Sequence, residues 1–260
     1  MISASLMPNR RNLLKALAVV APACAAAPAF AQSATGTATP PAPPCPVETP
    51  DNARAHTDFA WLSRYADDNR KLLASDAQVR IVFMGDSITQ GWRDKDPDFF
   101  PEGRINRGIG GQTTPQMLLR MMADVIALRP RAVHIMAGTN DIASNTGPMT
   151  AQMTRDNLAA MATLAKANGI TVLLASIPPA ANYPWRLGLD TMSPIAAHNV
   201  WLRDYAAANG HVWVDYHPAL AGPDGGMRPG FAVDGVHPTP DGYAAMNAVL
   251  LPILQKLRVA

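Results

Sequence analysis

The chain has 260 residues, 48% of them hydrophobic, which is enough for one domain with a buried core. Its formal net charge is +2, and three of the 22 basic residues lie in the first 31 positions, where no acidic residue occurs. The remaining chain has 19 basic against 20 acidic residues, and this near-neutral balance argues against a nucleic-acid-binding protein.

Residues 1–31 have the pattern of an export signal peptide. Arg10, Arg11 and Lys15 precede an apolar run, and the Ala-Phe-Ala at 29–31 fits a cleavage site. The run is too short and too rich in Ala and Pro to predict a membrane span. Because the paired arginines resemble a twin-arginine signal, we expect a protein that is exported to the periplasm or secreted.

The segment after the signal is expected to be a linker. Residues 32–50 are rich in Pro, Ala and Thr and carry almost no charge, which is typical of an extended, flexible tether. The two cysteines are Cys24, in the signal, and Cys45, which would be alone after cleavage, so no intramolecular disulfide is expected. Lipidation at Cys24 stays open, although the residues before it fit a lipobox poorly. The folded domain is then predicted at 51–260.

Within this domain, strand-like apolar runs alternate with helix-like stretches, the pattern of an α/β protein with a parallel sheet. The predicted strands are Arg80–Met84, Ala132–Ala137, Ile170–Ser176 and His211–Asp215. The predicted helices are Asp58–Ala74, Thr114–Leu128, Met149–Asn168, Ser193–Asn209 and Thr239–Leu257. Two of these helices end in Asn-Gly directly before a strand, where Gly tolerates the left-handed conformation that ends a helix.

Polar residues follow several of the predicted strands. GDS stands at 85–87 after the first strand, GTND at 138–141 after the second, and DYH at 215–217 after the fourth. Ligands of open α/β sheets bind at the carboxyl ends of the strands. The sequence therefore predicts a functional site at this edge.

Ser87 is the first candidate for chemistry. Serine becomes a nucleophile only when a base takes its proton, an acid orients the base and donors stabilise the oxyanion. A serine after a strand is also a common helix N-cap or turn residue, so Ser87 alone decides little. Asp234 and His237 lie three positions apart on a loop with Gly and Pro, so that the carboxylate can reach one ring nitrogen while the other faces a serine. Asp215 is the alternative acid.

Two sequence features could supply oxyanion donors. NRGIGGQTT at 106–114 has three glycines before a predicted helix, so its backbone N–H groups could approach a ligand closely. A phosphate-binding loop is the competing interpretation, but no GxxxxGK[ST] motif follows. Asn140 could offer its side-chain amide, or it could be a turn residue that bonds its own backbone.

In chain order, GDSIT, NRGIGGQTT, GTND and DGVHP resemble the four blocks of the SGNH, or GDSL-type, serine hydrolases, a family of esterases and lipases. The branch similar to platelet-activating-factor acetylhydrolase is included in this resemblance, which spans about residues 80–243. It implies a single-domain α/β fold, a three-layer α/β/α flavodoxin-like parallel sheet. The first block reads GDSIT where the name of the family has GDSL.

The resemblance also implies roles for individual residues. Ser87 would be the nucleophile, His237 the base and Asp234 the acid that orients it. The backbone N–H groups of Ser87 and Gly111 and the side chain of Asn140 would form the oxyanion hole.

Three aromatic residues, Trp92, Tyr183 and Trp185, are candidates for lining a substrate pocket, with a core position as the alternative. The stretch 178–193 that carries two of them is long for a plain connection, which favours contact with substrate. The six histidines show no metal-ligand spacing such as H-E-x-x-H, so neither a metal nor another cofactor is expected.

The sequence therefore predicts a serine esterase that hydrolyses carboxylic esters through an acyl-enzyme. A short acyl group such as acetyl is expected, on a small-molecule, carbohydrate or lipid ester. Two alternatives stay open: an acyltransferase with the same triad, and a non-catalytic carbohydrate-binding protein on the same fold. No nucleic-acid partner is expected, and no stable membrane insertion once the signal is removed.

Overall fold

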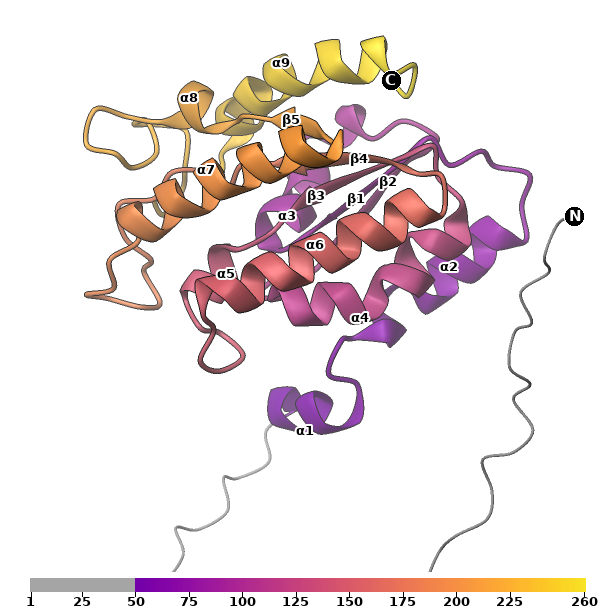
Figure 1. Ribbon diagram of the computed structural model, residues 1–260, viewed down its shortest axis with the longest axis horizontal. Coiled ribbons are helices and arrows are strands. Elements are labelled where there is room, and N and C mark those ends of the chain that lie inside the picture. Colours follow the sequence, from indigo (N-terminus) through magenta and orange to yellow (C-terminus); the bar gives the residue numbers. More distant parts are fainter. Residues whose placement is uncertain (1–49) are drawn as a thin grey trace, which may run out of the picture. The chain divides into compact units, whose positions relative to one another are not determined.

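The computed structural model describes residues 50–260, which are built around a five-stranded parallel sheet (Figure 1). The strands are β1 (Ile81–Gly85), β2 (Arg104–Gly108), β3 (Ala132–Met136), β4 (Thr171–Ala175) and β5 (Val212–Val214). Their order is β2-β1-β3-β4-β5, which is the flavodoxin-like arrangement. The predicted α/β fold with a parallel sheet is confirmed. The expected signal and linker lie outside the described residues, except for Pro50.

Helices precede, connect and follow the strands, as the alternating pattern predicts. They are α1 (Pro50–Thr57), α2 (Ala66–Leu73), α3 (Ser87–Lys95), α4 (Thr114–Asp124), α5 (Thr139–Ile142), α6 (Ala151–Ala167), α7 (Met192–Asn209), α8 (His217–Leu220) and α9 (Pro240–Lys256). The helix predicted from Asp58 begins later than expected. The Asp58 carboxylate accepts hydrogen bonds from the backbone N–H groups of Leu62 and Ser63, at 2.7 and 3.0 Å, at the start of a 3₁₀ turn that lies ahead of α2.

The sheet is covered on both faces because successive strand residues point to opposite sides. Ile81 and Phe83 of β1 pack in one apolar cluster with side chains of α3 and α9. Val82 and Met84 pack in a second cluster with side chains of α4, α6 and α7. The three helices of the second cluster lie side by side in front of the strands in Figure 1. The result is the predicted three-layer α/β/α arrangement.

Strand β2 was not predicted, and its side chains explain why. Its sequence, RINRG, has no apolar run, yet Arg104 and Arg107 are both buried. The Arg107 guanidinium donates to Asn69 Oδ1 at 2.7 and 3.0 Å, and Arg104 Nη1 donates to the carbonyl oxygen of Phe99 at 2.9 Å. Buried charges are tolerated when they are hydrogen-bonded, but partners that come from other elements leave no local pattern.

The strand register places the ends of three strands next to each other. Gly85 at the end of β1 pairs with Gly108 of β2 on one side and with Met136 of β3 on the other. The residues that follow these three positions therefore leave the sheet at the same edge, which is the edge where the sequence predicts a site.

Candidate active site

Ser87 is the first residue of α3 and lies two positions after Gly85, the last residue of β1. Both elements are seen in Figure 1. Asp86 caps the helix, since its Oδ1 accepts a hydrogen bond from the backbone N–H of Ile88 at 3.0 Å. The start of a helix carries partial positive charge, which favours negative charge that develops near Ser87. Asp86 is itself buried, and burial raises its pKa to about 6, although the Ile88 N–H and the charge of His237 oppose the rise.

Two further residues form a hydrogen-bond chain with Ser87. Ser87 Oγ lies 2.9 Å from Nε2 of His237, and His237 Nδ1 lies 2.8 Å from Oδ2 of Asp234. The carboxylate also accepts bonds from the backbone N–H groups of His237, at 2.8 Å, and of Val236, at 3.0 Å. Partial burial works to raise the pKa of Asp234, but these hydrogen bonds outweigh it and lower the pKa below its usual value. An ionised Asp234 would favour a ring proton on Nδ1, and Nε2 would then face Ser87 Oγ as an acceptor.

Asp215, the alternative acid, lies elsewhere. Its Oδ1 accepts a hydrogen bond from the backbone N–H of His217 at 3.2 Å, at the start of α8. Among the described residues, the carboxylate that contacts the ring of His237 is that of Asp234. The geometry therefore favours Asp234 over Asp215.

The glycine-rich loop is held against the start of α3. Gly108 packs so closely that a Cβ atom there would lie 2.2 Å from the backbone nitrogen of Gln90. The N–H of Gly110 donates to Gln90 Oε1 at 2.7 Å, and Gly111 has a φ of +75°, a conformation that favours glycine. Within residues 50–260, the N–H groups of Gly111 and Ser87 donate to no other residue, so both are available to a ligand.

Asn140 is buried in the first turn of α5 and does not bond its own backbone through its side chain. Its Nδ2 donates to the carbonyl oxygen of Gln112 at 3.0 Å, and its Oδ1 accepts from Nδ2 of Asn145 at 2.6 Å. Since Gln112 directly follows Gly111, this bond brings the Asn140 amide beside the glycine-rich loop. The three groups that the family resemblance names as oxyanion donors thus lie at one edge of the sheet.

Asp141, the last residue of GTND, connects the helices that surround Asn140 through hydrogen bonds. The sequence analysis assigned it no role. Its carboxylate accepts bonds from the backbone N–H of Thr114, at 3.0 and 3.2 Å, from the Thr114 hydroxyl, and from Thr154 Oγ1 at 3.2 Å. Burial raises the pKa of Asp141, and the bonds from Thr114 oppose the rise. The carboxylate joins α5 to the starts of α4 and α6.

The three aromatic candidates have different environments. Trp92 is completely buried and stacks on Phe99 with ring centroids 4.9 Å apart, so the prediction that it lines a pocket is wrong. Tyr183 is also fully buried and stacks beneath Trp185, at a centroid distance of 5.0 Å. Trp185 is 39% exposed, and its ring lies 6.0 Å from that of His237. The prediction for Tyr183 is corrected in the same way, since Trp92 and Tyr183 both fill the interior, where their rings bury large apolar areas.

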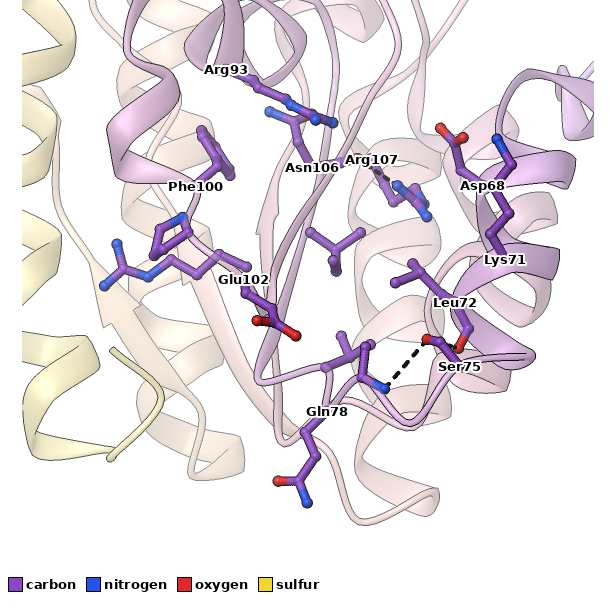
Figure 2. Close-up of a pocket in the computed structure, with 16 residues that line it drawn as sticks. Asp68, Lys71, Leu72, Ser75, Gln78, Arg93, Phe100, Glu102, Asn106 and Arg107 are labelled. Atoms are coloured by element: carbon purple, nitrogen blue, oxygen red, sulfur yellow. Dashed lines mark hydrogen bonds between the residues drawn. The ribbon is translucent and has the colours of Figure 1, made fainter.

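Two of the cavities in the folded domain bear on the site, and only one of these two contains a predicted site residue. One, of about 310 Å³, opens beside Gly111 and Asn145. Another, of about 490 Å³, lies along the outer strand β2, where Lys71 and Arg93 face it from α2 and α3 (Figure 2). The second cavity contains none of the predicted site residues. Among residues 50–260, no group of three His, Cys, Asp or Glu side chains is arranged to hold a metal ion.

Comparison with known proteins identifies the family. Residues 83–245 match the model of the GDSL-like lipase/acylhydrolase family, and the chain belongs to this family. The predicted resemblance is thereby confirmed. Family membership and the solved acylhydrolase neighbours support a carboxylic ester hydrolase.

Two solved structures are similar over nearly their whole length. A protein assigned as an acylhydrolase from Bacteroides fragilis is 42% identical, with a TM-score of 0.74, covering 78% of this chain and 99% of that one. A GDSL-like lipase from Bacteroides thetaiotaomicron is 44% identical, with a TM-score of 0.72, covering 76% and 99%.

Curated relatives match over shorter stretches. The uncharacterised lipoprotein YqeF of Bacillus subtilis is 32% identical over 38% of this chain and 48% of its own length. Platelet-activating factor acetylhydrolase IB subunit alpha1 of Bos taurus is 30% identical over 41% of this chain and 45% of its own length. The chain thus spans about half the length of the curated relatives it matches.

Proposed function

We propose that this domain is a serine esterase in which Ser87 is the nucleophile, His237 the general base and Asp234 the orienting acid. The observation that carries the proposal is the chain of two hydrogen bonds, 2.9 Å from Ser87 Oγ to His237 Nε2 and 2.8 Å from His237 Nδ1 to Asp234. This is the geometry in which an imidazole can remove a serine proton while a carboxylate stabilises the imidazolium.

The reaction would proceed in two steps. Ser87 Oγ attacks the ester carbonyl and its proton passes to Nε2 of His237, which then gives the proton to the leaving alcohol as the acyl-enzyme forms. A water molecule next attacks the acyl-enzyme, and His237 takes its proton and returns it to Ser87 as the carboxylic acid leaves. In both steps the negative carbonyl oxygen would accept hydrogen bonds from the N–H groups of Ser87 and Gly111 and from the amide of Asn140.

A short acyl group, such as acetyl, is the proposed substrate feature. The bovine relative is an acetylhydrolase by name, which supports this choice. Trp185, exposed beside His237, is proposed as one wall of the substrate site. A series of p-nitrophenyl esters tests the proposal: kcat/KM should fall from acetyl to octanoyl. A maximum at octanoyl would contradict it.

The proposed triad is tested by hydrolysis of p-nitrophenyl acetate. Ser87→Ala should lower kcat by roughly 10⁴ to 10⁶, because the acyl-enzyme cannot form. Ser193→Ala, at an exposed position in the first turn of α7, serves as the matched control and should keep full activity. A Ser87→Ala variant that hydrolyses the ester at the rate of the control would overturn the proposal.

The same experiment addresses the alternatives from the sequence. A carbohydrate-binding protein without catalysis would bind an acetylated sugar and leave it intact, with Ser87→Ala unchanged. An acyltransferase would move the acyl group to an added sugar or alcohol faster than to water. Quantifying free acetate against acetylated acceptor distinguishes these two reactions, and we expect acetate to dominate.

We also propose that the domain is exported by the N-terminal segment at 1–31 and tethered by 32–50. Support comes from the sequence pattern, and the relative that is a lipoprotein in Bacillus subtilis agrees with export. No helix among the described residues is both long enough and apolar enough to cross a membrane. Mass spectrometry of the exported protein should find Gln32 as the first residue. An intact N-terminus in the cell interior would contradict the proposal.

A further inference from the structure

We propose that Asn145 is a positioning residue for ester hydrolysis, because its side chain orients the amide of Asn140 and connects it to the indole of Trp185. The inference rests on the proposed function and goes further, since none of the four sequence motifs assigns a role to Asn145.

A continuous chain of hydrogen bonds leads from the surface to the proposed oxyanion hole. Trp185 Nε1 donates to Asn145 Oδ1 at 3.2 Å, and Asn145 Nδ2 donates to Asn140 Oδ1 at 2.6 Å. Asn140 Nδ2 then donates to the backbone carbonyl of Gln112 at 3.0 Å. The backbone N–H of Asn145 also donates to the carbonyl oxygen of Asn140 at 3.0 Å, which keeps the two residues together.

The ends of this chain determine the direction of every bond in it. The indole N–H of Trp185 can only donate, and the carbonyl oxygen of Gln112 can only accept. Asn145 must therefore turn its oxygen to Trp185 and its NH₂ group to Asn140. Asn140 must in turn present its oxygen to Asn145 and its NH₂ group to Gln112. Rotating either amide by half a turn would bring two donors or two acceptors together.

This orientation leaves one hydrogen of Asn140 for the substrate. An amide NH₂ group has two hydrogens, and one of them is used by Gln112. The other donates to no residue within 50–260. Because Gln112 directly follows Gly111, the second hydrogen belongs to a group that stands next to another proposed oxyanion donor. Asn145 and the Gln112 carbonyl therefore together turn a donor, instead of a carbonyl oxygen, toward the reacting ester.

The chain of hydrogen bonds also links the Asn140 amide to Trp185, the proposed wall of the substrate site. Asn140 is 3% exposed, whereas Trp185 is 39% exposed, stacks on Tyr183 and lies beside His237. Asn145 bridges these two environments. A substrate that packs on Trp185 would cover Asn145 and exclude the water that competes for its hydrogen bonds, which strengthens the bond that orients Asn140.

Asn145→Asp is the sharpest test because it preserves shape and removes the donor. A carboxylate oxygen would face Asn140 Oδ1, so the Asn140 amide should turn over: it exchanges its bond to the Gln112 carbonyl for a stronger one to the charged carboxylate and presents its oxygen to the substrate. With p-nitrophenyl acetate we expect kcat to fall roughly 10²-fold, close to the loss of one oxyanion donor, while KM stays within about threefold. Asn145→Ala should cost less, below about tenfold, since water can occupy the vacated place.

Two comparisons separate a positioning role from a general structural effect. Asn168→Asp makes the same chemical change at the exposed end of α6, on the opposite edge of the sheet, and should alter neither kcat nor KM. The double variant Asn140→Ala/Asn145→Asp should have the kcat of Asn140→Ala alone, because Asn145 acts only through Asn140. Losses that multiply, or an Asn145→Asp variant within threefold of wild type, would overturn the proposal.

A third variant, Trp185→Phe, keeps the inference testable even if Asn145→Asp does not fold. Trp185→Phe keeps the ring on Tyr183 and removes the N–H, so kcat should fall by up to about tenfold. Combined with Asn145→Asp it should add no further loss. If the two losses multiply, the chain does not act as a unit and the inference fails. The proposed function itself fails by a different result, a Ser87→Ala variant that stays active.

Discussion

Two aspartates of the candidate site, Asp234 and Asp141, make their hydrogen bonds in contrasting ways. The side chain of Asp234 is 38% exposed and accepts hydrogen bonds from residues two and three positions along the chain. Asp141 is 1% exposed and accepts from Thr114 and Thr154, on two other helices. Removing the first should therefore affect the chemistry and spare the fold, whereas removing the second should weaken the fold itself. The part of the site that holds the proposed base, His237, is thus a local turn, which we call the local side. The part that holds the proposed oxyanion donor Asn140 is a buried network between helices, which we call the buried side.

The largest expected effect falls on the local side. Asp234→Asn should lower kcat by roughly 10⁴, as expected when the acid that orients the base of a triad is neutralised. Its free energy of unfolding should change by less than about 1 kcal/mol, because exposed charge pairs contribute little to stability. Steady-state kinetics and urea unfolding measure the two quantities.

Asp215→Asn is the matched control for this prediction. Its carboxylate contacts the backbone at His217, so kcat should change less than about threefold. If Asp215→Asn were the more damaging substitution, the role of acid would pass to Asp215.

On the buried side, Asn140→Ala should lower kcat by roughly 10² to 10³, the usual consequence of losing one oxyanion donor. KM should change little, because the bond to the oxyanion strengthens in the transition state. Kinetics with p-nitrophenyl acetate provide the measurement. A loss of less than threefold would remove Asn140 from the oxyanion hole.

Asp141→Ala should act mainly on stability. The substitution leaves the Thr114 N–H and the hydroxyls of Thr114 and Thr154 without their acceptor in the interior, so the free energy of unfolding should fall by at least about 3 kcal/mol. Urea unfolding at pH 7 measures the change, with Asp234→Ala as the exposed counterpart. Equal losses in the two variants would contradict the contrast between the two sides.

The smallest expected effect concerns Asp86 and depends on pH. Burial raises its pKa from 3.8 to about 6, so the folded protein binds this proton more tightly than the unfolded chain. Above pH 6 the buried charge lowers the free energy of unfolding, and as the pH falls through 6 toward 4 this cost disappears. Asp86→Asn should therefore be more stable than wild type at pH 8, by about 1 to 3 kcal/mol, and its advantage should shrink at pH 4.5.

Thermal and urea unfolding at the two pH values test this difference. Asn at position 86 can still accept the bond from Ile88, so the helix cap should survive. A stability gain that is the same at both pH values would show that the charge of Asp86 is not its cause.

Much of the fold could be predicted from the sequence because most elements have a local signature. The apolar strands β1, β3, β4 and β5 lie within a residue or two of their predicted bounds. Strand β2 could not be predicted, since its buried arginines depend on acceptors at Asn69 and Phe99 that no pattern in RINRG reveals. Trp92 shows the same limit, because a tryptophan five residues after Ser87 suggests a pocket until the aromatic core around it is known.

The sequence by itself determined the family, the parallel α/β fold and the set of residues proposed for catalysis, because four ordered motifs and the alternation of strands and helices are local properties of the chain. Tertiary structure decided what lies within bonding distance. It places Ser87 2.9 Å from a histidine 150 positions away, and it connects Trp185 to Asn140 through Asn145. Hydrogen bonds depend on direction and on distances of about 3 Å, and only the folded chain sets these between residues far apart in sequence.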